Sequence, residues 1–365
     1  MPHKITLLPG DGVGPEITEA TRKVLASLDL EFEWEIGIVG ELALQQFGTP
    51  LPEKVLDSIR KNKVALKGPV TTPIGTGFRS INVALRQKLD LYACLRPCRS
   101  YPGIRTPFPN VDIVIVRENK EDLYSGIEFA RGSSESEELR ELIVKANYKP
   151  VTDDTGFSIK VISETNSRRI VKFAFEYARA HNRKKVTAIH KANILKFSDG
   201  LFLSVARDMA TQYTDIGFED VVVDAACMRL VKNPQAFDVM VLPNLYGDII
   251  SDLCAGLIGG LGVAPGANMG DNMAIFEPTH GSAPKYRGQN KVNPMAMMLS
   301  AKLMLDYIGE KQAAVRLEKA IASVIAEGKK LTYDLKANSS KSAATTSEVA
   351  NAVIEKLNIK GGHNA

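Results

Sequence analysis

The chain lacks the features of a membrane protein or a nucleic-acid-binding protein. Its 46 Lys and Arg and 42 Asp and Glu residues leave a net charge of only +4, and no polybasic run stands out. This balance argues against nucleic acid and fits a small anionic substrate better. The most apolar segment, residues 253–267, is rich in glycine and falls short of the roughly 18 residues that a membrane helix needs.

Secretion signals and metal-binding cysteine patterns are absent as well. The opening residues, MPHKITLLPGDG, show neither the charged region nor the long apolar stretch of a signal peptide, so a cytoplasmic location is expected. Cys94, Cys98, Cys227 and Cys254 have no paired spacing, and reduced thiols in the core are the expected state. No repeat or low-complexity tract appears.

The remaining pattern is that of an α/β protein. The 365 residues are 44% hydrophobic and 24% charged, enough for two ordinary domains. Short apolar runs such as ITLLP, VALKG, VDIVIV, VTAIH, VVVDA and FDVMVLP alternate with segments of helical periodicity. Helices are expected at residues 15–28, 164–181, 197–213, 294–308 and 311–327. Residues 125–162 are polar, break the alternation and are expected to form an inserted arm.

Three aspartates form a candidate metal site. In NLYGDIISDL, Asp248 and Asp252 are four residues apart, which places both on one face of a helix just after an apolar strand. Asp224 ends the predicted strand VVVD. Like charges at this spacing destabilise a helix unless a cation lies between them, so the pair favours a divalent ion. The alternative, a solvated acidic face, conflicts with the apolar and glycine-rich flanks.

Three arginines form a candidate anion site. Arg86 and Arg96 lie in RSINVALRQKLDLYACLRP with Ser80 and Asn82, and Arg117 follows the strand VDIVIV. Guanidinium groups bind carboxylates bidentately and stay charged when desolvated, so the cluster fits a substrate with several carboxylates.

Four further segments carry candidates for catalysis or cofactor binding. Lys191 in AIHKANI and Tyr124 in EDLYSG are a possible base and acid. The early motif LPGDGVGPE reads G-x-G-x-G rather than G-x-G-x-x-G, which excludes a Rossmann fingerprint. The late segment EPTHGSAPKYRGQNKVNP combines a loop with Lys285, Tyr286 and Arg287, all donors suited to a phosphate.

Taken in order, these motifs resemble the β-decarboxylating dehydrogenases, and the isocitrate dehydrogenase branch best. The resemblance runs from Lys4 to about Leu357, through LPGDGVGPE, GPVTTPIGTGFRSINVALRQKLDLYACLRP, RENKEDLYSGIE, HKANILKFSDGLF, NLYGDIISDLCAGLIGGLGVAPGANMGD and HGSAPKYRGQNKVNP. It implies a two-domain α/β fold with a central mixed sheet, not a Rossmann fold. The large, cofactor-side domain would comprise 1–91 plus 259–365, the small domain 92–121 plus 165–258, and a clasp-like arm 122–164.

The resemblance also implies a role for each candidate residue in a homodimer with shared active sites. Asp248 and Asp252 of one protomer, together with Asp224 of the other, would bind Mg²⁺ or Mn²⁺. Arg86, Arg96 and Arg117 would hold the carboxylates of isocitrate, and Ser80 and Asn82 would contact its distinguishing carboxylate. Lys191 would assist proton removal, and Tyr124 would protonate the enol. The cofactor would contact Thr71, Thr72 and Glu277 at the nicotinamide end and His280, Gly281 and Asn293 at the adenosine end.

NADP is the expected cofactor, with NAD as the alternative. Lys285, Tyr286 and Tyr333 are donors for a 2′-phosphate, and Val292 matches the NADP pattern by resemblance. An arginine of that pattern is replaced by Ala337, for which Lys336 or Arg287 are candidates to compensate. Two further possibilities stay open, namely homoisocitrate as the substrate and a noncatalytic regulatory subunit. Isopropylmalate, in contrast, would need an apolar patch at Ser80 and Asn82.

Overall fold

A single mixed sheet of ten strands runs through the whole molecule. The computed structural model describes residues 2–72, 80–336 and 342–359. The order across the sheet is β2-β1-β3-β12-β11-β4-β5-β10-β8-β9. The strands are β1 (His3–Leu8), β2 (Phe32–Ile36), β3 (Val64–Lys67), β4 (Ala93–Arg99), β5 (Asp112–Glu118), β8 (Lys185–His190), β9 (Gly217–Val222), β10 (Val239–Leu242), β11 (Pro265–Met269) and β12 (Ala274–Pro278).

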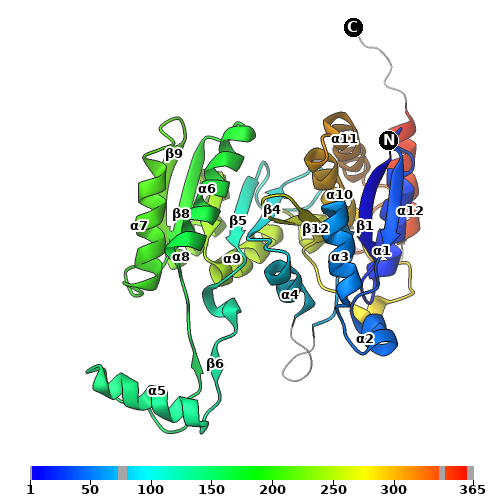
Figure 1. Cartoon of the computed structure of the whole chain (residues 1–365). Coiled ribbons are helices and arrows are strands. Elements are labelled where there is room, and N and C mark those ends of the chain that lie inside the picture. Colours follow the sequence, from blue (N-terminus) through cyan, green and yellow to red (C-terminus); the bar gives the residue numbers. More distant parts are fainter. Residues whose placement is uncertain (1, 73–79, 337–341, 360–365) are drawn as a thin grey trace.

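Helices cover the sheet around two centres (Figure 1). Helices α6 to α9 pack around the end of the sheet formed by β5, β10, β8 and β9. Helices α1, α10, α11 and α12 pack around the other end, which contains β1 and β12. The helices are α1 (Gly14–Leu25), α2 (Glu41–Phe47), α3 (Glu53–Asn62), α4 (Ile81–Lys88), α5 (Ser134–Lys145), α6 (Glu164–Ala180), α7 (Ser198–Ala210), α8 (Val223–Lys232), α9 (Asn244–Leu257), α10 (Met295–Tyr307), α11 (Lys311–Glu327) and α12 (Thr346–Asn358). In the described ranges no helix is both long and apolar enough to cross a membrane.

Strand direction changes at the middle of the sheet and makes it mixed. Strands β4 and β11 pair antiparallel with each other and with their outer neighbours β5 and β12. On one side β5, β10, β8 and β9 are all parallel, so their carboxyl ends share one edge. The chain leaves each strand at that edge. Arg117 and Lys191 therefore lie there, at the ends of β5 and β8, and helices α8 and α9 begin there, after β9 and β10.

The elements follow the periodicity of the sequence. Strand β5 is buried from Ile113 to Glu118 because helices pack on its faces, which explains its continuous apolar run. Helix α6 begins where the Ser163 side chain accepts from the backbone N–H of Asn166. The five predicted helices correspond to α1, α6, α7, α10 and α11, and the mixed α/β sheet is confirmed. One boundary was wrong: the strand ends at Val222, and Asp224 lies in the first turn of α8.

The polar segment that interrupts the alternation extends away from the body (Figure 1). It contains α5 and a separate two-stranded sheet of β6 (Glu128–Phe129) and β7 (Phe157–Ser158). At its base the 3-10 helix η1 (Asp122–Ser125) carries Tyr124 back to the sheet edge. The division into domains predicted from the sequence stays a prediction.

Candidate active site

Arg117 and Asp248 form the centre of a polar cluster at the carboxyl edge of β5 and β10. Arg117 is 1% exposed, donates from Nε and Nη2 to Oδ1 of Asn244 at 2.9 and 2.7 Å, and donates to Asp248. The Tyr124 hydroxyl donates to the other oxygen of Asp248, and its ring lies 4.8 Å from the Arg117 guanidinium carbon. One carboxylate thus joins residues from β5, η1 and α9.

Arg96 on β4 extends this cluster along α9. Its Nη1 donates to Oγ of Ser251 at 2.5 Å and lies 3.4 Å from Asp248 and 3.5 Å from Asp252. The spacing predicted from the sequence is therefore realised, because Asp248 and Asp252 meet the same guanidinium one helical turn apart.

Arg86 on α4 sits in a deeper network on the β12 side. Its Nε donates to Oδ1 of Asn268 at 2.9 Å, and its Nη2 lies 3.8 Å from Glu277. Glu277 accepts from Nδ2 of Asn268 at 2.6 Å and pairs with the buried Lys67 at 2.5 Å. A cavity of about 90 Å³ lies between these side chains and is lined by Asn82, Arg86, Arg96, Glu277, His280 and Gly281, among others. The buried Oδ1 of Asn82 has no hydrogen-bond partner among the described residues.

Positive charge exceeds negative charge in this region. Burial, together with Arg86 and Arg96, lowers the pKa of Arg117 to about 10, so it is still charged at neutral pH. Burial opposes ionisation of Asp248, yet Arg117 and Arg96 bring its pKa below the usual value. The pKa of Asp252 is raised by partial burial and by the charge of Asp248. Carboxylate oxygens with such mutual repulsion fit a hard divalent cation, and the surrounding arginines fit a polyanion.

Lys191 and Asp224 form a separate pair in this chain. The Lys191 ammonium donates to Asp224, and its backbone N–H donates to Asp199 at 2.6 Å. No group of three or more acidic, His or Cys side chains suited to a metal occurs among the described residues, so Asp224 does not join Asp248 and Asp252 within one chain. The structure thus brings the predicted arginines, Tyr124, Asp248 and Asp252 into one cluster. The pair of Lys191 and Asp224 lies outside that cluster in the same chain.

A second cavity, of about 450 Å³, holds most of the predicted cofactor residues. It is lined by His280, Gly281, Tyr286, Val292, Asn293, Tyr333, Asp334 and a glycine-rich turn at 259–262. His280 and Gly281 also line the small cavity beside Arg86, so the two spaces meet there. The buried Nε2 of His280 has no hydrogen-bond partner among the described residues, which leaves a polar atom for a ligand. Asn293 donates to Asp334 at 3.0 Å.

The early glycine motif packs against the loops that contain Thr71 and Ser282. Asp11 accepts from the backbone N–H groups of Glu41 and Thr71 at 2.9 and 2.8 Å. Gly10 and Gly12 have φ of +77° and +56°, and a Cβ at Gly12 would lie 2.1 Å from the backbone oxygen of Ser282. The backbone at residues 69 and 282 therefore packs so closely on the glycine motif that a side chain at Gly10 or Gly12 has no room.

Hydroxyl groups connect the loops near the glycine motif. Thr71 and Ser282 are hydrogen bonded through their hydroxyls at 2.9 Å, and Thr72 donates to Ser80 at 3.4 Å. Ser80 directly precedes α4 and follows residues that the structure does not describe.

Cationic and phenolic side chains gather at the rim of the larger cavity. The Lys285 ammonium lies 4.8 Å from the ring centre of Tyr286, and Lys291 lies 5.3 and 5.0 Å from the rings of Tyr286 and Tyr333. Hydrogen bonds from Tyr333 and Lys285 lower the pKa of Tyr286. Lys291 was not among the predicted residues. Ala337, on which the NADP prediction partly depended, lies outside the described residues.

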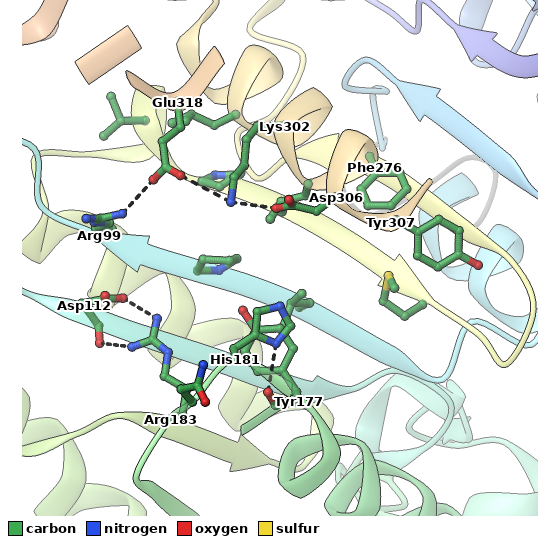
Figure 2. A pocket seen from close by; sticks show the side chains of 18 of the residues that line it. Arg99, Asp112, Tyr177, His181, Arg183, Phe276, Lys302, Asp306, Tyr307 and Glu318 are labelled. Carbon is green, nitrogen blue, oxygen red and sulfur yellow. Dashed lines mark hydrogen bonds and ion pairs between the residues drawn. The ribbon is translucent and has the colours of Figure 1, made fainter. Parts of the chain in front are cut away.

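A third cavity, of about 570 Å³, lies elsewhere and contains none of the predicted site residues. Figure 2 shows its charged side chains paired with one another: Glu318 lies 2.9 Å from Arg99 and 3.4 Å from Lys302, and Arg183 pairs with Asp112 at 2.6 Å. These charged side chains are thus paired with one another. Cavity size alone does not locate the site.

Several supporting residues escaped the sequence interpretation. Asn244 is the first residue of the segment NLYGDIISDL, four residues before Asp248, so helical spacing alone could have placed it on the same face. Asn268 and Lys67 carry no local signal, because only the pairing of β12 with β3 and β11 brings them to Arg86. Ser251 lies between the two aspartates in sequence and packs against β4.

Known proteins confirm what this geometry suggests. The family model described as isocitrate/isopropylmalate dehydrogenase matches residues 4–353. The chain belongs to this family. A regulatory subunit of the mitochondrial isocitrate dehydrogenase [NAD] of Dictyostelium discoideum is 47% identical over 98% of this chain and 93% of its own length. A probable alpha subunit of the mitochondrial isocitrate dehydrogenase [NAD] of Caenorhabditis elegans is 46% identical over 91% of this chain and 87% of its own.

A solved relative has the same fold. The crystal structure of isocitrate dehydrogenase from Methylococcus capsulatus superimposes with a TM-score of 0.89 at 46% identity, covering 97% of this chain and 99% of that one. The two relatives above are named as mitochondrial proteins, which contradicts the cytoplasmic prediction. Both are named as NAD enzymes, so the comparisons do not support the NADP-type assignment within the isocitrate/isopropylmalate dehydrogenase family.

Proposed function

We propose that this chain oxidises and decarboxylates isocitrate to 2-oxoglutarate and carbon dioxide with reduction of a nicotinamide cofactor. The observation that carries the proposal is the arginine cluster: Arg86, Arg96 and Arg117 are all buried, Arg86 and Arg96 line one small cavity, and Arg117 shares Asp248 with Arg96. Asp248, Asp252 and Glu277 neutralise the three arginines and Lys67 only in part. A substrate with three carboxylates would supply further counter-charge, most of all when a divalent cation occupies the aspartates. Ser80 and Asn82 would contact the carboxylate that separates isocitrate from isopropylmalate.

Asp248 and Asp252 of one protomer, with Asp224 of its partner, would hold Mg²⁺ or Mn²⁺. The donor set of carboxylate oxygens and the raised pKa of Asp252 support this assignment. When bound, the cation would increase the acidity of the substrate 2-hydroxyl and stabilise negative charge on that oxygen.

Lys191 of the partner, as the neutral amine rather than the ammonium that pairs with Asp224, would accept the proton of the 2-hydroxyl as hydride leaves C2 for the nicotinamide ring. The bond between C3 and its carboxylate then breaks, carbon dioxide departs, and the electron pair forms the enolate. Tyr124 would deliver a proton to C3, since its hydroxyl is oriented by Asp248 at the edge of the arginine cluster. The two residues therefore act at different steps.

A homodimer would bring Lys191 and Asp224 to the partner's site. Apolar side chains are exposed around them: Phe197 is 88% exposed and Ile194 65%, and Met228, Val231 and Ile249 on α8 and α9 are at least half exposed. Such a patch is typical of an interface between protomers. The predicted domains, 1–91 plus 259–365 and 92–121 plus 165–258, with the arm 122–164, would then place the site between them.

The names of the relatives favour NAD as the cofactor. Thr71, Thr72 and Glu277 would contact its nicotinamide end, and His280, Gly281, Val292 and Asn293 its adenosine end. A second candidate, NADP, is favoured by Lys285, Lys291, Tyr286 and Tyr333, whose charges and hydroxyls suit a 2′-phosphate. The ratio of kcat/KM for the two cofactors decides between them.

A noncatalytic regulatory subunit is the second candidate function, because one relative is named as a regulatory subunit. Tyr124, Lys191 and the three aspartates are all present, which favours catalysis. A steady-state assay of the purified chain alone, with isocitrate, homoisocitrate and 3-isopropylmalate, tests the proposal. Turnover of isocitrate with the highest kcat/KM is expected. No turnover without a second type of subunit would support the regulatory candidate instead.

A further inference from the structure

A buried ionic triad connects the segments that carry Tyr124 and Lys191. Lys160, just after β7 at the base of the arm, lies 2.7 Å from Oδ1 of Asp199 and 3.5 Å from Oδ1 of Asp122. Both aspartates are fully buried, and the Lys160 side chain is 14% exposed. Its ammonium lies 4.1 Å from the ring centre of Tyr246 on α9.

Asp122 holds the turn of Tyr124. Its φ of +67° is unusual for a residue other than glycine, and its backbone N–H donates to Val161. The carboxylate accepts from the N–H of Leu245 at 2.8 Å, in the first turn of α9. Asp122 therefore ties η1 to the helix that carries Asp248.

Asp199 holds the backbone of Lys191. It lies in the first turn of α7, and its Oδ2 accepts the Lys191 N–H at 2.6 Å. The orientation of the Lys191 side chain thus depends on where this carboxylate sits.

Lys160 is the cation that both carboxylates face. Burial lowers the pKa of Lys160, but the hydrogen bond to Asp199 and the charge of Asp122 outweigh it and raise that pKa. Without the lysine, two buried carboxylates would lie near each other with their counter-charge removed, and one or both segments would have to shift. Such a shift would matter for Tyr124 and Lys191, because a misplacement of a catalytic group by about 1 Å can lower the rate roughly a hundredfold.

We propose that Lys160 is a positioning residue that fixes Tyr124 and Lys191 together. The proposal rests on the proposed function, in which Tyr124 serves the chain's own site and Lys191 serves the partner's. One lysine in one chain then supports both sites of the dimer, although it contacts no substrate.

Mixed dimers with wild type separate this role from general destabilisation. In a dimer of Lys191→Met with wild type, one site keeps all its residues, so about half of the wild-type activity is expected. In a dimer of Lys160→Met with wild type, one site has a displaced Tyr124 and the other a displaced Lys191. Activity of about a tenth or less is expected. Lys160→Arg, which retains the charge, should restore most of it.

The controls make each outcome decisive. Lys149→Met changes an exposed lysine of the same arm and should leave the mixed dimer fully active. Cofactor binding checks that each variant folds, and Lys160→Gln replaces Lys160→Met if the methionine variant does not. Half or more of the activity in the Lys160→Met or Lys160→Gln mixed dimer overturns the proposal. A mixed dimer of Lys191→Met with Asp252→Asn tests the shared site separately, because one of its two sites is intact if the sites are shared and neither is intact if they are not.

Discussion

Asp248 and Asp252 lie one turn apart on α9 and have opposite pKa shifts. Despite burial, Arg117 and Arg96 lower the pKa of Asp248, whereas partial burial and the neighbouring carboxylate raise that of Asp252. The first aspartate is already balanced by a guanidinium. A divalent cation would therefore stabilise the ionised form of Asp252 more than that of Asp248.

Asp252→Asn is therefore expected to abolish isocitrate oxidation at ordinary metal concentrations, because a neutral amide holds a divalent ion weakly against water. Binding of the cofactor alone, measured by fluorescence titration, should survive. Asp29→Asn, at a side chain that is 91% exposed, is the matched control and should retain activity. Wild-type turnover in excess chelator would show that the metal role is wrong.

Lys191→Met and Tyr124→Phe are expected to fail at different steps. Hydride transfer from isocitrate should be lost in the first variant, while the second should be impaired mainly in handling the enol. Supplying oxalosuccinate bypasses the oxidation and separates the two. Decarboxylation of oxalosuccinate by Lys191→Met at a normal rate supports its role in the oxidation step; equal failure with isocitrate and oxalosuccinate, with intact folding, indicates a structural lysine.

A mixed dimer tests whether two chains build each site. A chain with Lys191→Met combined with a chain with Asp252→Asn should regain up to half of the wild-type activity, because one of its two sites then contains neither change. Each variant alone should be inactive. Absence of rescue after verified exchange of protomers would contradict a shared site.

The sheet edge and α9 could be predicted from the sequence because their signals are local. An apolar run followed by aspartates at i and i+4 specifies a strand, a helix and the face on which the carboxylates lie. Asp224 shows the limit of this approach. The β-branched run before it is typical of a strand, yet the strand ends at Val222 and the helix begins one residue before Asp224.

Residues that act through long-range contacts could not be predicted. Lys160 lies in the arm, far in sequence from Asp122 and Asp199, and only the return of β7 to the body places it between them. Lys67 and Asn268 reach Arg86 through strand pairing alone. The cytoplasmic location was predicted wrongly, because the absence of a secretion signal does not distinguish between compartments inside the cell.

Glu118 gives the stability of the fold a pH dependence. It ends β5 beside Arg117 and is 3% exposed, and burial raises its pKa from 4.5 to about 7, although two backbone N–H groups donate to it. The folded state binds this proton more tightly than the unfolded state, so the free energy of unfolding falls as pH rises from 4.5 to 7. The contribution is at most roughly 3 kcal/mol.

Urea unfolding of Glu118→Gln measures this contribution. The variant should lose that part of the pH slope, whatever its absolute stability, because the amide does not titrate. Glu128→Gln, at an exposed carboxylate of the arm, should keep the wild-type slope. An unchanged slope in Glu118→Gln would assign the pH dependence to other groups.

The cofactor rim yields the last prediction, in which the names of the relatives and the side chains of this chain disagree. Lys285 and Lys291 surround Tyr286 and Tyr333, and such cations stabilise a 2′-phosphate through charge-assisted hydrogen bonds worth about 1.5 to 3 kcal/mol each. Lys285→Asp with Tyr286→Ile should therefore raise KM for NADP by roughly tenfold or more, while KM for NAD changes little. Lys54→Asp, at a lysine over the Phe47 ring on α2, is a charge-matched control and should alter neither. If wild type prefers NAD by tenfold or more and the double variant leaves KM for NADP unchanged, the rim does not contact the phosphate. The proposed decarboxylation would not be affected, because it depends on the three arginines and on Asp248 and Asp252, none of which lines the cofactor cavity.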